Sequence, residues 1–514
     1  MVTPLDYDNR LQAVVRPAVV PLTEQLRRVP PNRVAALIDS RIFTYGQLTA
    51  EAHLAAENYR DHGVKAGTVV GVQLANSWAF MVAHVALAEL GAVMATLHRP
   101  LTDRECHALL EFVGASFWLN PEGWEALRDI PAEPTAANER PLDGQWPLAI
   151  FYTSGTQSLR PKPCLHSHQT LLGNAAVVAR DGEMNADDVF ISASPFTHLF
   201  GILSCHLAWV LGARQIIIER YGPRGFLNSC RNQGATIAFM VPTHIRDLLD
   251  YLREHPEESQ GVALREIRTA GAAVSPDLAD RVFSRLEAKL VNHWGMSEIG
   301  GGTYTHWRDE VAVAAESIGR PSAGAQVMLL DESGRVVETP DVPGEMLFRG
   351  PSLFYGYYGN SKATNEALYQ DAQGQWWLRT GDIVSWSNQG RLRYLGRLKD
   401  IVNRGGVKID ALEIEHAVLT LEGIRTAALV AEPDTRLGER ATLVIERTNS
   451  TISITLTQVQ QHLAQFGIAK FKWPERLVIW DKLPTTPTGK LAKARIREQL
   501  RQAPVANANA PLSP

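Results

Sequence analysis

Residues able to bind phosphate gather in one stretch of the sequence, Phe151–His168. An apolar run, Leu148–Tyr152, leads into a loop of small hydroxylated residues, and Lys162 follows this loop. The loop begins with Thr153, Ser154, Gly155 and Thr156. A strand that ends in such residues leaves backbone N–H groups that can cradle phosphate oxygens, and a lysine adds a point charge. Ordinary polar turns share this composition. The spacing differs from a Walker A loop, because no glycine directly precedes Lys162 and no serine or threonine follows it.

A second stretch, Asn292–Gly302, brings an aromatic ring, a hydroxyl and a carboxylate close together. Trp294 offers a face for stacking, Ser297 has a short hydroxyl, and Glu298 has the hard oxygen atoms that Mg²⁺ prefers. The esterase pattern G-x-S-x-G does not fit, because Ile299 stands where the second glycine is required. The stretch therefore offers groups for stacking, hydrogen bonding and metal binding, and it does not fit a nucleophilic serine.

Three later segments place charged residues at glycine turns. Thr380–Asp382 puts a carboxylate at a glycine turn, although Asp–Gly pairs are common in turns. Tyr394–Lys408 joins basic residues to a Gly-Gly pair, and Leu483–Lys490 is an extended loop of prolines and threonines with a lysine at its tip. Loop lysines are usually only solvated. A fourth segment, Gly344–Gly359, has the character of strands and glycine turns and carries no obvious chemistry.

These segments, in this order, resemble the motifs of the adenylate-forming superfamily, which includes acyl- and aryl-CoA ligases, adenylation domains of peptide synthetases and beetle luciferases. The phosphate loop matches at Thr153–Thr156 and Pro161-Lys162, with Gln157-Ser158 in place of Thr-Gly and one residue inserted before the proline. Trp294–Glu298 is similar to the family's Tyr-Gly-x-Thr-Glu, with Trp for Tyr and Ser for Thr. The resemblance extends from about Thr44 to Arg501 and is most like a stand-alone acyl- or aryl-acid CoA ligase.

The resemblance implies a role for each matching residue. Lys162 and Lys490 offset charge on the phosphates and the attacking carboxylate, and Glu298 holds Mg²⁺. Asp382 grips the ribose, and Arg397 lies near the ribose or the α-phosphate. The other residues that the resemblance assigns to ATP or AMP are Thr153, Ser154, Gly155, Thr156, Gly271, Ala272, Asn292, Trp294, Gly295, Met296 and Ser297.

The acid pocket, the hinge and the thiol side are assigned in the same way. A lone histidine on an apolar segment is usually a satisfied core residue. In the family, however, the histidine that matches His198 lines the acyl pocket near the carboxylate. The remaining pocket residues are Gly271, Gly295 and Gly301. Lys399 falls where the family hinges between its two domains. The side that receives the thiol includes Gly405, Gly406 and Lys408.

Strands and helices must position these residues. Short apolar runs alternate with amphipathic stretches along the chain, and this pattern predicts an α/β fold with largely parallel sheets. In the first part we expect strands at 69–74 and 116–119 and a helix at Ser77–Leu90 that Gly91 ends. Residues 121–147 read as a surface connection. Around the motifs we expect strands at 215–218, 237–241 and 268–274 and helices at 169–178, 224–233 and 244–253.

The resemblance divides the chain into a large N-terminal domain, residues 1–398, and a small mobile C-terminal α/β lid domain, residues 399–502. In the small domain we expect helices at 411–420 and 456–465. Its expected strands are 426–431, 441–447 and 476–479. The last residues, 503–514, are rich in Ala, Pro and Asn and indicate a disordered tail.

The composition is that of a globular chain of 514 residues, 45% hydrophobic and 21% charged, which is long enough for a large core. A net charge of −4 and the lack of a basic run give no reason to expect nucleic acid. The cysteines form no C-x-x-C pair, which favours a reducing compartment; they are Cys106, Cys164, Cys205 and Cys230. The apolar run 78–97 is interrupted by His84, Glu89 and Gly91, so we expect a buried helix and a strand in a cytoplasmic protein without a membrane span.

The resemblance implies an AMP-forming acid–thiol ligase that uses ATP, Mg²⁺ and CoA. A carboxylic acid attacks the α-phosphate to give acyl-AMP and pyrophosphate, and a thiol then takes the acyl group. Amino-acid-activating relatives carry an Asp just after the strand that ends here at Pro195. Phe196–Leu203 contains no acid, so an apolar or aromatic substrate is expected. Three alternatives stay open: transfer to the phosphopantetheine arm of a carrier protein, a nucleotide-binding homologue without ligase activity, and a luciferase-like oxygenase.

Overall fold

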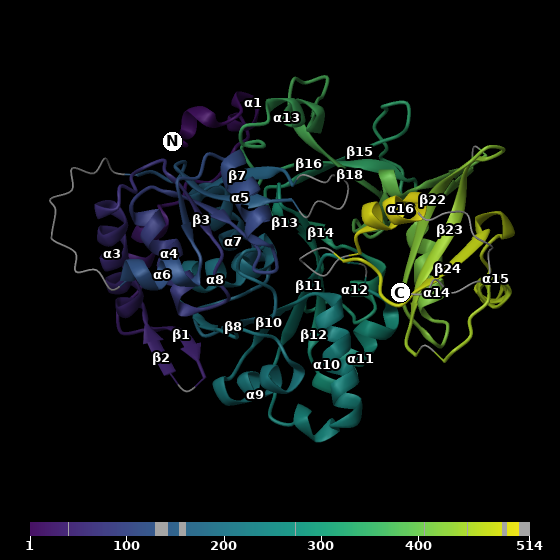
Figure 1. Cartoon of the computed structure of the whole chain (residues 1–514), viewed down its shortest axis with the longest axis horizontal. Coiled ribbons are helices and arrows are strands. Elements are labelled where there is room, and N and C mark those ends of the chain that lie inside the picture. Colours follow the sequence, from purple (N-terminus) through teal and green to yellow (C-terminus); the bar gives the residue numbers. More distant parts are fainter. Residues whose placement is uncertain are drawn as a thin grey trace. The chain divides into compact units, whose positions relative to one another are not determined.

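The computed structural model describes residues 1–39, 41–128, 142–153, 161–272, 274–405, 407–449, 451–485 and 491–502 (Figure 1). The expected tail at 503–514 lies outside the described residues. The chain divides into two compact units. One contains Met1–Thr153, Pro161–Val327 and Phe348–Leu378, and the other contains Met328–Leu347 and Arg379–Pro514. The domain boundary after residue 398 stays a prediction.

The first unit is built on two sheets whose central strands are parallel. The larger, nine-stranded among the described residues, has the order β14-β13-β12-β11-β10-β8-β9-β1-β2, with antiparallel pairs only toward its two edges. Its strands, from one edge to the other, are Arg320–Pro321, Gly300–Tyr304, Lys289–Met296, Glu266–Ala270, Ile237–Met240, Val189–Ser192, Arg214–Ile216, Val34–Ile38 and Arg41–Thr44. The parallel interior confirms the expectation of α/β layers.

The second sheet has the order β5-β3-β4-β6-β7 and is parallel except for the last pair. Its strands are Phe117–Leu119, Val69–Val72, Val93–Thr96, Pro147–Tyr152 and Pro163–Ser167. The helices α4, α7 and α8 share one apolar core with strands of both sheets, and Figure 1 shows them grouped among these strands. The helix α4 is apolar on nearly every side, and such a helix must be buried all round.

The helices of the first unit mostly follow the strands that they cover. They are α1 Asn9–Gln12, α2 Leu22–Arg27, α3 Tyr45–Asp61, α4 Trp78–Glu89, α5 Asp103–Phe112, α6 Pro121–Arg128, α7 His168–Asp181, α8 Leu199–Leu211, α9 Pro223–Gln233, α10 Pro242–Glu254, α11 Pro276–Leu286, α12 Val313–Glu316 and α13 Ser361–Ala367. The prediction of a connection at 121–147 was wrong at its start, where α6 forms; residues 129–141 lie outside the described part.

A third sheet has the order β15-β16-β18-β17 with β19 paired to β18. Its strands are Gln326–Leu330, Gly344–Arg349, Trp376–Trp386, Leu368–Gln370 and Leu392–Arg397. The boundaries between the two units fall within β15, β16 and β18. Strands β18 and β19 are antiparallel neighbours, and this pairing sets Asp382 opposite Arg397.

The fourth sheet forms the core of the second unit. Its order is β21-β20-β23-β22 with β24 beside β23, and its strands are Val407–Ile409, Val402–Arg404, Gly438–Arg447, Ile424–Asp434 and Arg476–Trp480. Because side chains alternate along a strand, Ala427 and Leu429 of β22 pack on one face with α14 (Ala411–Leu419) and α15 (Leu456–Gln465). Ala428 and Val430 pack on the other face with α16 (Lys493–Gln502).

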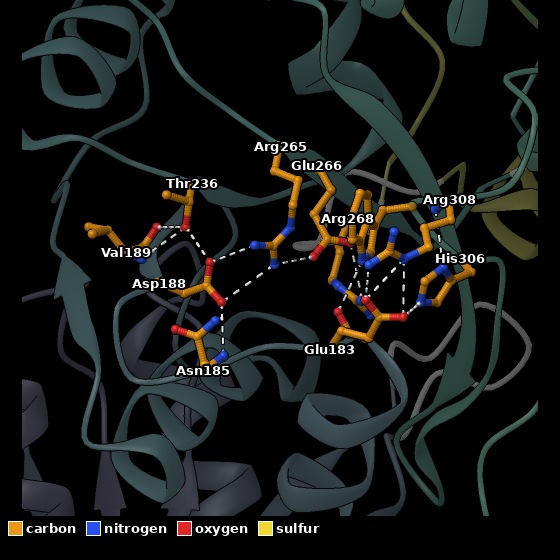
Figure 2. A network of polar contacts seen from close by, with 12 residues as sticks. Glu183, Asn185, Asp188, Val189, Thr236, Arg265, Glu266, Arg268, His306 and Arg308 are labelled. Atoms are coloured by element: carbon orange, nitrogen blue, oxygen red, sulfur yellow. Dashed lines mark hydrogen bonds and ion pairs between the residues drawn. The ribbon is translucent and has the colours of Figure 1, made fainter.

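A polar network ties the amino-terminal ends of β8, β10 and β11 together (Figure 2). Asp188 accepts from Arg265 Nη1 at 2.9 Å and from Thr236 Oγ1 at 2.8 Å. The fully buried Arg268 pairs with Glu266 at 3.2 Å. In open α/β sheets ligands bind beyond the carboxyl ends of the strands. This network lies at the opposite ends of the strands, where it supports the fold.

The apolar run 78–97 forms the buried helix α4 and the strand β4, as expected. Within the described ranges, none of the helices combines the length and the apolar character needed to cross a bilayer. All four cysteines are buried and form no disulfide.

Candidate active site

The base of the hydroxyl-rich loop is closed by reciprocal contacts between its two ends. Lys162 N donates to Thr153 Oγ1 at 3.0 Å, and Thr153 N donates to Lys162 O at 2.9 Å. These residues directly follow β6 and precede β7, which are antiparallel neighbours. Of the loop residues named from the sequence, Ser154, Gly155 and Thr156 lie outside the described part of the chain.

The turn between β12 and β13 carries Ser297 and Glu298 and lies beside the end of β6. Ser297 Oγ donates to Tyr152 O at 3.3 Å, and His166 Nε2 lies 2.8 Å from Ser297 O. Burial lowers the pKa of His166 to about 4, so its ring is neutral near pH 7 and donates to that carbonyl. The carboxylate and the phosphate loop, which are far apart in the sequence, are therefore joined through β6 and β7.

Glu298 is buried, with 4% of its surface exposed, and it is held by a residue that the sequence motifs did not single out. Tyr357 Oη donates to Glu298 Oε1 at 2.5 Å. The ammonium of Lys162 lies 4.7 Å from the centre of the same tyrosine ring. The segment Gly344–Gly359, in which the sequence showed no obvious chemistry, therefore contributes a residue that contacts both Glu298 and Lys162.

The residues present fit a magnesium site of one particular kind. Glu298 offers a buried carboxylate, and its neighbour Ser297 contacts Tyr152 O at the end of β6. No group of three or more His, Cys, Asp or Glu side chains in the described part of the chain could hold a metal ion. Mg²⁺ typically binds through one or two carboxylates, several waters and the phosphates of a substrate, and a single buried carboxylate suits that arrangement.

The other residues of the second motif have clear structural duties. Asn292 donates through Nδ2 to Ala314 O and Ser317 O at 2.9 and 3.0 Å.

A Cβ on Gly295 would lie 1.8 Å from Gly300 O, so the hairpin closes only with glycine there. A Cβ on Gly301 would lie 2.9 Å from the ring of His293. Trp294 is buried and its ring lies 6.1 Å from that of Phe348. The neighbouring Met296 ends β12.

His198 lies at the carboxyl-terminal side of the large sheet, where it begins α8. Its Nδ1 accepts from Phe200 N at 3.2 Å, so the neutral ring carries its proton on Nε2. The ring of His98, which follows β4, stacks at 6.2 Å, and His98 Nδ1 lies 3.0 Å from Thr197 Oγ1. Sequence motifs did not single out His98; its place just beyond the carboxyl end of a parallel strand was the available signal.

Gly271 and Ala272 directly follow β11 and are exposed. Gly271 has φ of +96°, a backbone conformation that residues with a side chain rarely adopt. The turn at this residue ends the strand earlier than expected. Backbone that can approach a flat ligand closely is consistent with the role that the resemblance gives these two residues.

In the second unit, Asp382 and Arg397 form an ion pair. Arg397 Nε donates to Asp382 Oδ1 at 2.9 Å, with 3% of the aspartate side chain and 35% of the arginine side chain exposed. Thr380 Oγ1 donates to Met346 O at 2.6 Å and accepts from Asp382 N at 3.1 Å. Gly381, between them, has φ of +69°. The structure thus brings together the two residues assigned to the ribose.

The expected hinge residue, Lys399, lies in a short 3₁₀ turn, Leu398–Asp400. Asp400 is paired with Arg497 of α16 at 2.6 Å, which anchors the residue after the hinge to the small unit. Gly405 N donates to Leu437 O at 2.7 Å, and the backbone of Lys408 pairs with that of Asn403. Gly406 and Lys490 lie outside the described residues.

Comparisons with known proteins identify the family of the chain. Residues 22–358 match the family model "AMP-binding enzyme", and residues 413–490 match "AMP-binding enzyme C-terminal domain". A 2-hydroxy-7-methoxy-5-methyl-1-naphthoate–CoA ligase from Streptomyces carzinostaticus is 29% identical, covering 93% of this chain and 92% of the relative. A salicylyl-CoA synthase / salicylate adenylyltransferase from a Streptomyces species is 30% identical over 90% of each chain.

Solved structures show the same fold. ATP-bound MatB from Rhodopseudomonas palustris superposes with a TM-score of 0.83 at 24% sequence identity, covering 94% of this chain and 99% of that one. The family model alone spans more than half of the sequence, and it includes the phosphate loop, His198, Glu298 and Tyr357. The chain therefore belongs to the AMP-binding enzyme family, the adenylate-forming enzymes that its motifs resemble.

Proposed function

We propose that this enzyme uses ATP to activate an apolar or aromatic carboxylic acid and transfers the acyl group to the thiol of CoA. The observation that carries the proposal is the placement of Glu298 and Lys162 against one tyrosine at the base of the hydroxyl-rich loop. One buried carboxylate and one ammonium beside a phosphate loop suit the binding of a nucleoside triphosphate with its metal.

In the first step a carboxylate oxygen of the acid bonds to the α-phosphorus of ATP, and the bond to the pyrophosphate oxygen breaks. Bound Mg²⁺ would offset the negative charge of the phosphate oxygens, with Glu298 as its protein ligand. Lys162 and the loop hydroxyls hold the phosphates, and Asp382 with Arg397 orients the nucleoside. Lys490 neutralises charge that builds up at the attacked phosphate, so its effect is concentrated in the transition state.

In the second step the sulfur of the thiol bonds to the acyl carbon, AMP leaves, and the thiol proton passes to solvent. We propose that the small domain turns about Lys399 between the two steps and brings Gly405, Gly406 and Lys408 toward the thiol. A hinge of a few residues at a domain junction suits such a rotation. Catalysis in both steps consists mainly of positioning and electrostatics. A cytoplasmic location, with CoA as the acceptor, stays a prediction.

The names of the two relatives support an aromatic acid, because each acts on an aryl carboxylate. The segment after β8 agrees, since Phe196–Leu203 contains no carboxylate and Phe200 packs 5.2 Å from Phe239. A site for an α-amino acid would need a countercharge for the ammonium group.

The test is the exchange of labelled pyrophosphate into ATP with a panel of aryl, alkyl and amino acids. We expect exchange that depends on an aryl or apolar acid and on Mg²⁺. Adding CoA or a phosphopantetheinylated carrier protein, and weighing the product by mass spectrometry, identifies the acceptor. Lack of exchange with every acid of the panel would favour a nucleotide-binding protein without ligase activity.

A further inference from the structure

Tyr357 lies between the two charged residues to which the proposed function gives the phosphates and the metal. Its hydroxyl donates to Glu298 Oε1 at 2.5 Å, and its ring lies 4.7 Å below the ammonium of Lys162. Only 7% of its surface is exposed. One side chain therefore contacts both charges from the protein side of the site.

The backbone of Tyr357 is fixed from two directions. Its N–H donates to Thr364 Oγ1 of α13 at 3.0 Å, and it forms an isolated bridge with Cys164 of β7. On either side of it, Leu165 N donates to Gly356 O and Tyr358 N donates to Pro163 O. Because the same strand, β7, follows Lys162 directly, the tyrosine and the lysine share one rigid support.

The hydrogen bond to Glu298 is of a strong type. A hydroxyl that donates to a carboxylate makes a short, charge-assisted bond, and a buried carboxylate without such partners is costly. The carboxylate of Glu298 is the acceptor and the hydroxyl of Tyr357 is the donor of this bond.

The contact with Lys162 is of a different type. An ammonium within about 6 Å of a ring centre is attracted by the ring face, and this attraction requires the ring but not the hydroxyl. The two contacts can thus be removed separately, because phenylalanine keeps the ring and leucine removes both.

We infer that Tyr357 is a positioning residue: its hydroxyl sets the orientation in which Glu298 meets Mg²⁺, and its ring holds Lys162 toward the phosphates. The inference rests on the proposed function. Partners that orient a metal-binding carboxylate from behind typically contribute about tenfold or more to metal affinity. The hydroxyl should therefore affect the requirement for magnesium, and the ring should affect the affinity for ATP.

The test compares Tyr357→Phe, Tyr357→Leu and a matched control, Tyr355→Phe. Tyr355 lies two residues away, is buried, and donates to Gln169 Oε1 at 3.3 Å, away from Glu298 and Lys162. Binding of α,β-methylene-ATP, which cannot release pyrophosphate, is followed by calorimetry at increasing Mg²⁺. Pyrophosphate exchange is followed over the same Mg²⁺ range, and thermal unfolding checks that each variant is folded.

For Tyr357→Phe we expect the Mg²⁺ concentration at half-maximal binding to rise about tenfold, with binding at saturating Mg²⁺ nearly unchanged. For Tyr357→Leu we expect the same rise and, in addition, nucleotide binding at least about threefold weaker at saturating Mg²⁺. Tyr355→Phe should match the wild type. An unchanged Mg²⁺ dependence in a folded Tyr357→Phe, or an equal shift in the control, would overturn the inference. If the wild type itself shows no acid-dependent exchange, the proposed function fails; the calorimetric comparison still decides the role of Tyr357.

Discussion

At the scale of single residues, the side chains of the site also hold the backbone in place. His198 Nδ1 caps α8 by accepting from Phe200 N. Asn292 Nδ2 donates to the carbonyl of Ala314 in α12 and to that of Ser317 just after this helix. A substitution at either position changes the stability of the fold together with any contact to a ligand. An effect on chemistry can therefore be isolated only against a variant that keeps the hydrogen bond.

His198 allows such a separation. His198→Ala removes the cap and should lower the free energy of unfolding by about 1 kcal/mol, whereas His198→Asn keeps a good capping side chain. If the histidine also lines the acid pocket, both variants should raise KM for the acid at least about fivefold and leave KM for ATP unchanged. Urea unfolding and steady-state exchange measure the two effects. Restoration of both quantities by asparagine would show that the histidine is only a cap.

Glu298 and Lys162 stand out in the sequence because each lies in a short run that resembles a family motif, and their roles stay predictions. Tyr357 could not be named in this way. Its hydrogen bond joins positions 59 residues apart, and it forms only because β7 places residues 354–358 beside the turn of Glu298. Contacts that depend on tertiary packing leave no pattern in the local sequence.

At the scale of elements, the predictions were most accurate where a cap marked the boundary. The helix expected at Ser77–Leu90 is α4, Trp78–Glu89, with Ser77 Oγ accepting from Phe80 N at 3.2 Å and Gly91 at φ of +65°. The strand expected at 268–274 ends instead at Ala270, because Gly271 turns the chain. The helix α6 was missed although Asn120 Oδ1 accepts from Gly123 N at 2.8 Å, a start signal that a short polar segment obscures.

Three of the helices that pack between the sheets carry buried histidines, which predict a loss of stability in acid. His84 Nε2 of α4 lies 3.1 Å from His206 Nε2 of α8, and His168 begins α7. Burial lowers the pKa of His84 and of His168 to about 3, below the ordinary value of about 6.5. The folded protein therefore stays neutral at these sites while the unfolded chain takes up protons as the pH falls below about 6.5.

The contribution of these neutral histidines to the free energy of unfolding is complete above about pH 6.5 and is lost as the pH falls toward about 3. Over this range the free energy of unfolding changes by up to about 1.4 kcal/mol per pH unit for each histidine. Urea unfolding between about pH 7.5 and 5.5 should show this decline. The double variant His84→Leu/His206→Leu should have a shallower slope, and His107→Gln, at an exposed position, should keep the slope of the wild type. An unchanged slope in the double variant would contradict the assignment to the α4–α8 pair.

At the scale of the whole molecule, the residues to which the resemblance gives roles come from both compact units. Lys162, Glu298 and His198 belong to the first unit, and Asp382 and Arg397 belong to the second. Composition and alternation predicted the α/β class, and the order of the motifs predicted the family. The sequence predicted the class of acid but not its identity, because pocket shape depends on side chains from many elements, and it left open the choice between CoA and a carrier protein.

Lys490 is the residue that best tests the proposal of a reaction in two conformations. If its ammonium acts only during attack on the α-phosphate, Lys490→Ala should lower acid-dependent pyrophosphate exchange by about a hundredfold or more. The same variant should form thioester from supplied acyl-AMP and CoA at a rate within about threefold of the wild type, because that step does not use the lysine. Lys482→Ala, which removes an exposed lysine before the same loop, is the matched control and should leave both rates unchanged. Equal losses in the two half-reactions would mean that Lys490 supports a single arrangement of the domains, and the rotation about Lys399 would have to be abandoned.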